Sequence, residues 1–93
     1  MSADVRPSSY FTLMSQYNAA VIPLSRVVKD YFPHLSEQKF LQKALRGEVT
    51  LPIVRIEDSQ KAARGVDIRD LADYLDERRE AAVRERDALC GRS

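Results

Sequence analysis

The sequence predicts a mainly α-helical domain that carries one small β-hairpin. Apolar residues recur at helical spacing in four segments, one β-branched segment alternates in the manner of a strand, and prolines and glycines separate several of these segments. The chain has 93 residues, which is enough for one small domain with a modest hydrophobic core.

The first predicted helix covers residues 8–18. Four apolar residues lie at the i, i+3, i+4 and i+7 positions of one helical face: Tyr10, Leu13, Met14 and Tyr17. We expect this aromatic stripe to face the core. Val21 and Ile22 then precede Pro23, and they predict either a short strand or an extended lead-in to the next helix.

Residues 24–46 predict two short amphipathic helices joined by a tight break. Pro33 ends the first helix, because the residue before a proline is pushed out of the helical region. Ser36 is a natural N-cap of the second helix, and Gly47 stands where a left-handed C-terminal cap is expected. The apolar face of the first helix consists of Leu24, Val27, Val28 and Tyr31. A gap this short between two helices is typical of a helix-turn-helix.

The second helix of this pair has one apolar face and one basic face. The expected core face consists of Phe40, Leu41, Ala44 and Leu45. The opposite face carries Lys39, Gln42, Lys43 and Arg46. Such side chains suit a DNA-reading helix, because Lys and Arg can contact guanine and Gln can contact adenine in the major groove. Ser36 and Gln38, at the start of the helix, are further candidates for phosphate or base contacts.

A β-hairpin is predicted after Gly47. Val54 and Ile56 alternate with charged residues inside the segment 51–57, which is the pattern of a half-buried strand, and residues 66–68 return as a second strand. The polar, basic segment 58–65 then forms the tip. A wing of this kind can hold phosphates or enter the minor groove. The candidate DNA contacts of the wing are Arg55, Ser59, Gln60, Lys61 and Arg64.

The last predicted helix begins after Asp67, which offers an N-cap. Its apolar stripe consists of Ile68, Leu71, Ala72 and Leu75. The stripe is clean to about residue 77 and is then broken by Arg79 and Arg86. We therefore divide the chain into a flexible tail (1–9), a DNA-binding domain (10–77) and a charged helical extension (78–93). This extension is either solvated or part of a dimer seam.

Charge and composition restrict the classes of function that the sequence allows. Residues 1–65 hold nine Lys and Arg against six Asp and Glu, whereas residues 66–93 hold six against eight, so the positive charge lies with the DNA-reading half. No phosphate loop, nucleophile elbow or zinc spacing occurs in the sequence. His34 and Cys90 stand alone, so we expect no enzyme, cofactor or metal. The lack of a long apolar run or a signal peptide predicts a cytoplasmic, nucleoid-associated protein with no membrane contact.

The order helix, helix-turn-helix, hairpin and helix describes a winged helix-turn-helix. Several stretches in this order closely resemble the pyocin activator protein (PrtN) family: LMSQYN (13–18), IPL (22–24), DYFPHL (30–35), KFL (39–41), LPIVRI (51–56), SQKAARGV (59–66) and DLADYL (70–75). The resemblance covers about residues 11–79. The layout is more loosely similar to excisionase-type and MerR-type winged helices. The family resemblance implies a bacterial or prophage-encoded transcription activator that binds a promoter element upstream of bacteriocin or phage-tail-like genes.

Three functions are compatible with this layout. A sequence-specific activator has promoter DNA and RNA polymerase as partners, and we expect it to form a homodimer, at least on DNA. An excisionase-type architectural protein bends DNA during recombination. An adaptor uses its helix-turn-helix to contact another protein. The first two bind duplex DNA in a salt-dependent manner and differ in whether their site lies upstream of a promoter or at an attachment site.

Overall fold

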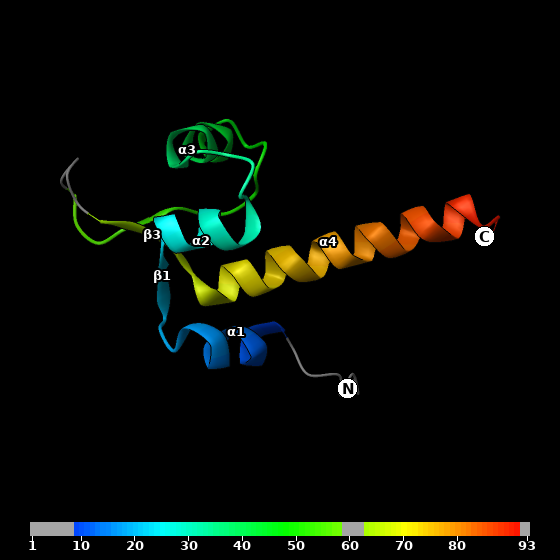
Figure 1. Ribbon diagram of the computed structural model, residues 1–93, viewed down its shortest axis with the longest axis horizontal. Helices are drawn as coiled ribbons and strands as arrows, with labels where there is room; N and C mark the ends of the chain where they lie inside the picture. Colours follow the sequence, from blue (N-terminus) through cyan, green and yellow to red (C-terminus); the bar gives the residue numbers. More distant parts are fainter. Residues whose placement is uncertain (1–8, 59–62, 92–93) are drawn as a thin grey trace.

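A computed structural model describes residues 9–58 and 63–91 of the chain. These residues form four helices and three strands: α1 (Ser9–Tyr17), β1 (Val21–Pro23), α2 (Leu24–Tyr31), α3 (Glu37–Leu45), β2 (Val54–Arg55), β3 (Arg64–Asp67) and α4 (Ile68–Leu89). The strands form one antiparallel sheet in the order β1-β3-β2. The fold is therefore mainly α with a small sheet, as predicted, and it is consistent with a winged helix (Figure 1).

Local capping explains where the helices begin and end. The Ser36 hydroxyl oxygen accepts a hydrogen bond from the backbone N–H of Lys39 at 3.1 Å, which caps α3. A carboxylate oxygen of Asp67 accepts one from the backbone N–H of Arg69 at 2.8 Å, which caps α4. Gly47 follows α3 with φ of 77°, in the left-handed region. The three predicted caps are confirmed.

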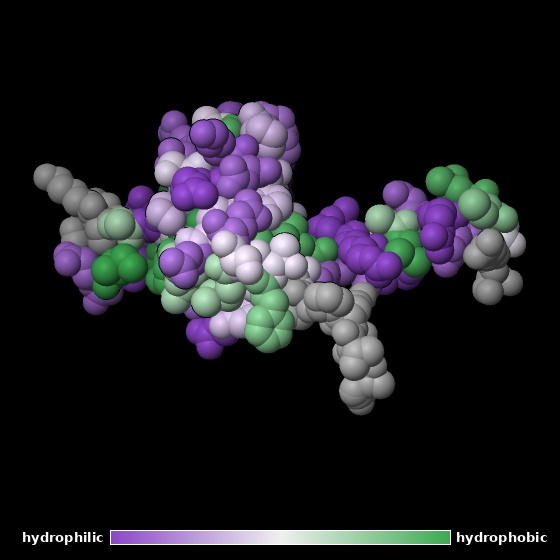
Figure 2. Space-filling view, turned by 60° about the horizontal axis from the view of Figure 1, so that its bottom comes forward, coloured by the Kyte–Doolittle hydropathy of each residue, from purple (hydrophilic) through white to green (hydrophobic). Residues whose placement is uncertain are grey.

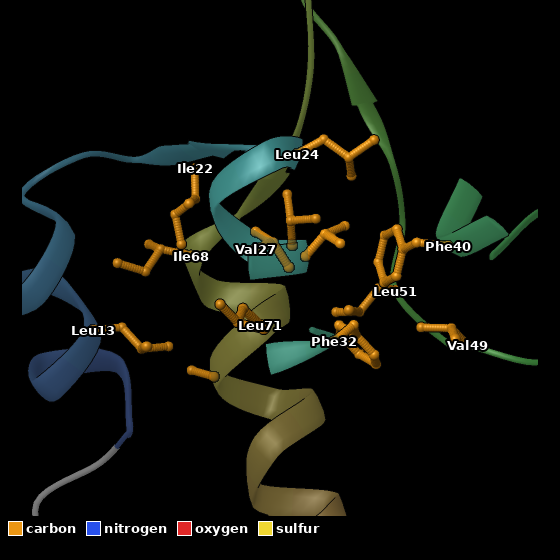
Figure 3. Close-up of a cluster of buried hydrophobic side chains, with 13 residues drawn as sticks. Leu13, Ile22, Leu24, Val27, Phe32, Phe40, Val49, Leu51, Ile68 and Leu71 are labelled. Carbon is orange, nitrogen blue, oxygen red and sulfur yellow. The ribbon is translucent and has the colours of Figure 1, made fainter. Parts of the chain in front are cut away.

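The hydrophobic core joins α2 and α3 to the sheet and to the first half of α4 (Figure 3). Phe40 is fully buried, and its ring centroid lies 4.8 Å from that of Phe32, so α3 is anchored on α2. The α1 helix packs along α4, where Leu13 is buried and the Ser9 hydroxyl donates a hydrogen bond to Asp76 at 2.6 Å. The predicted inward orientation of the α1 stripe is confirmed, because Tyr10, Met14 and Tyr17 pack against this core.

The sheet differs in extent from the predicted hairpin. Among the described residues, β2 and β3 pair at Val54 with Gly65 and at Arg55 with Arg64, and the Ile56 N–H donates one further hydrogen bond to the Ala63 carbonyl oxygen at 3.2 Å. Ile56 lies beyond this paired part and is 65% exposed, so its predicted half-buried position is wrong. The return strand begins earlier than expected, and Ile68 is the first residue of α4 instead of a strand residue. The segment before Pro23 is a strand, which pairs with β3 on the side opposite to β2.

The α4 helix continues without interruption through the charged segment. It has 22 residues, and its second half extends away from the body of the molecule (Figures 1 and 2). The segment 78–89 is rich in Ala, Arg and Glu, which favour helix even where few core contacts support it. The apolar stripe thus ends before the helix does.

Gly65 allows β1 to approach β3 closely. It pairs with Pro23 on one side and Val54 on the other. A Cβ atom at this position would lie 2.6 Å from the carbonyl oxygen of Ile22 and 2.7 Å from a side-chain carbon of Val21. We expect Gly65→Ala to separate the two strands and to lower the free energy of unfolding by about 1–3 kcal/mol, the usual range for overpacking. Urea denaturation measures this loss, and an unchanged midpoint would contradict the close approach.

Candidate nucleic-acid interface

The polar face of α3 forms the centre of the candidate interface. Phe40 anchors the opposite side of the helix in the core, so this face points outward. The predicted contact residues on it are exposed, apart from Lys43, which is half-buried: Ser36, Gln38, Lys39, Gln42, Lys43 and Arg46. The structure therefore brings the six predicted residues together on one helix, its N-cap and its C-cap.

Two of the predicted basic side chains are engaged within the protein. The ammonium of Lys43 and the guanidinium of Arg46 each lie 3.3 Å from a carboxylate oxygen of Glu48. Hydrogen bonds from Lys43 and then from Arg46 hold the pKa of the Glu48 carboxyl below its usual value. Sequence reasoning missed this contact because Glu48 lies outside the helix. Gly47 could have indicated the contact, because its left-handed conformation turns the chain so that Glu48 lies near the end of α3.

Leu45 belongs to the exposed face and not to the core. It was predicted to be buried beside Phe40, but it is 77% exposed, so this prediction is wrong. Five residues separate the two side chains, which places them about 140° apart around a helix of 3.6 residues per turn. Leu45 instead shares a face with Gln38 and Gln42, because these three residues follow the spacing i, i+4 and i+7.

The second part of the candidate interface is the wing, the hairpin formed by β2 and β3. Arg55 and Arg64 are cross-strand partners. Directly opposite residues of an antiparallel pair project from the same face, and like charges placed there destabilise the sheet. Within the described part of the chain, neither arginine forms an ion pair. The wing therefore concentrates positive charge, and the repulsion between these two arginines lowers the stability of the sheet.

The wing and α3 meet at an open hollow. Leu41 and Leu45 of α3 line it together with Ile53, Arg55 and Arg64. The lining of the hollow thus combines three apolar side chains with two arginines. Three predicted wing contacts, Ser59, Gln60 and Lys61, lie outside the described residues.

Comparison with known families and structures complements this geometry. The family model described as pyocin activator protein PrtN matches residues 9–82. The match includes all of α1, α2 and α3, the sheet and most of α4, and it confirms the family resemblance found in the sequence. No curated protein and no solved structure matches the chain. Among the described helices, none is long and apolar enough to cross a membrane.

Proposed function

Because the chain belongs to the family of the pyocin activator protein PrtN, we propose that it activates transcription of bacteriocin (pyocin-like) or prophage genes by binding duplex DNA. The observation that carries this proposal is the hollow that Leu41 and Leu45 of α3 line together with Arg55 and Arg64 of the wing, because it places two arginines against the helix whose outer face is polar. The polar side chains of α3 suit contacts to base edges, and the two arginines of the wing suit contacts to phosphates. The family is one of activators and not of enzymes.

In the proposed complex, α3 enters the major groove and the wing contacts the neighbouring backbone. The exposed Gln42 side chain can make two hydrogen bonds to adenine, which would specify sequence. Arg55 and Arg64 neutralise phosphates, which relieves the repulsion between two like charges on the same strand pair. Activation further requires RNA polymerase as a partner.

A genomic footprint tests this function. The full chain is incubated with sheared genomic DNA at physiological salt, and the bound fragments are sequenced. We expect protected sites upstream of promoters of bacteriocin or phage-tail-like genes. Sites at recombination attachment sequences would support the excisionase-type alternative instead. A chain that retains no duplex would favour the adaptor.

We also propose that the protein binds DNA as a homodimer through the second half of α4. Leu75, Ala82 and Leu89 follow a spacing of seven residues, which places them along one side of the helix. Leu89 is 84% exposed near the end of a projecting helix, and Figure 2 shows hydrophobic residues gathered there. A second copy of the same helix would cover this side, and two copies would read two half-sites.

Removal of residues 78–93 tests the dimer. The shortened chain keeps the part of α4 that packs on α1 and the core, so we expect it to fold as a monomer. It should bind a full two-half-site duplex more weakly than the complete chain, and about as weakly as a single half-site. Analytical ultracentrifugation and DNA titration measure both effects. Equal assembly and equal affinity of the two chains would show that the extension is merely solvated.

A further inference from the structure

We propose that the face of α3 formed by Gln38, Gln42 and Leu45 reads A·T base pairs, with Leu45 packed against the 5-methyl group of a thymine. This inference rests on the proposed DNA-binding function and adds the class of base that the helix recognises.

The surroundings of Leu45 favour a partner with both apolar and anionic groups. A single exposed leucine is ordinary on a protein surface. Leu45, however, is 77% exposed and lines a hollow together with two apolar residues, Leu41 and Ile53, and two arginines, Arg55 and Arg64. An apolar patch bordered by two cations complements a methyl group that lies close to phosphates. Thymine in the major groove provides this combination, because its methyl is the apolar group of the base edges there.

The neighbours of Leu45 on the helix favour the same base pair. Gln38 and Gln42 are exposed, and with Leu45 they form one stripe at i, i+4 and i+7. Glutamine pairs in a bidentate manner with N6 and N7 of adenine. The stripe spans about 10 Å along the helix axis at 1.5 Å per residue, which is about three steps of duplex DNA at 3.4 Å each. Its three side chains can therefore address adjacent base pairs.

Two of the three cations on α3 and its C-cap, which could favour guanine, form ion pairs within the protein, and the third, Lys39, lies about 120° around the helix from Leu45. Lys43 and Arg46 each lie 3.3 Å from the Glu48 carboxylate. A contact from either residue to guanine O6 or N7 would compete with this ion pair. The glutamine and leucine side chains face no such competition, so A·T pairs are the preferred target of the exposed stripe.

Replacement of thymine by deoxyuridine removes only the methyl group and tests the contact. The full chain first selects its preferred duplex from a random pool, and each thymine of that duplex is then exchanged singly. Burial of one methyl group is worth about 0.8 kcal/mol, so we expect one exchange to weaken binding of the wild-type chain about fourfold. Leu45→Ala should bind the thymine duplex about as weakly as wild type binds that uracil duplex, and should not distinguish the two.

Phe11→Ala is the matched control, because it truncates an exposed apolar side chain on α1, outside both the hollow and the proposed dimer contact. It should keep the wild-type ratio between thymine and uracil duplexes. The inference is overturned if no exchange affects the wild-type chain, or if Leu45→Ala retains the full ratio; in both cases DNA binding itself would stand. A wild-type chain that selects no duplex would instead overturn the proposed function, and this inference with it.

Discussion

Replacement of Phe40 by alanine is expected to lower the free energy of unfolding by about 3–5 kcal/mol, the usual range for truncating a buried phenylalanine. Phe40 is fully buried, and its ring packs against Phe32. It is also the fully buried residue of α3, so its removal takes away the main anchor of the helix. Small domains are stable by only about 5–15 kcal/mol, so a large share of the stability is lost. Urea unfolding followed by circular dichroism measures the change.

Leu45→Ala is the internal control for this experiment. Leu45 lies on the same helix and is 77% exposed, so its truncation should change the free energy of unfolding by no more than about 0.5 kcal/mol. Equal losses in the two variants would contradict the orientation of α3, and with it the assignment of the outward face to DNA.

Joint replacement of Arg55 and Arg64 by alanine is expected to weaken binding to every duplex, whatever its sequence. Each arginine that neutralises one phosphate contributes about 0.9 to the dependence of log affinity on log salt. The double variant should therefore reduce that slope by about 2. Its stability should be unchanged, or raised by up to about 1 kcal/mol, because two opposed like charges are removed from the sheet. Titration at several salt concentrations, together with urea unfolding, measures both effects.

A double variant of Arg78 and Arg84 serves as the comparison. Both side chains are exposed on α4, away from the wing, so the salt slope should stay close to that of the wild-type chain. If this variant and the wing variant lower the slope equally, binding would depend on general positive charge and the wing would have no special place in the interface.

Much of the fold could be predicted because its local signals agree with one another. Ser36, Gly47 and Asp67 mark helix ends through their own backbone chemistry, independently of tertiary contacts. The extent of the sheet could not be predicted in the same way. Whether the segment before Pro23 pairs as a strand depends on Gly65, 42 residues away, which leaves room for a close approach.

In the candidate interface too, some features follow from local sequence and others depend on tertiary contacts. Spacing alone predicted the exposed polar face of α3, because periodicity fixes which residues share a side of a helix. The same spacing wrongly predicted that Leu45 is buried. A short helix anchored by one phenylalanine buries a narrower stripe than its apolar residues suggest. Spacing also gave no indication that Glu48 holds Lys43 and Arg46, since that contact depends on how the chain turns after Gly47.

In the proposed function, this chain recognises a particular duplex through α3 and the wing. The most direct test is a fluorescence titration of the full chain against its selected duplex and a scrambled duplex of the same composition, at several salt concentrations. We expect the affinity for the selected duplex to be at least about 10³-fold above that for the scrambled one at physiological salt, and both affinities to fall as salt rises. Equal affinity for the two duplexes, or no binding to either, would contradict the proposed function.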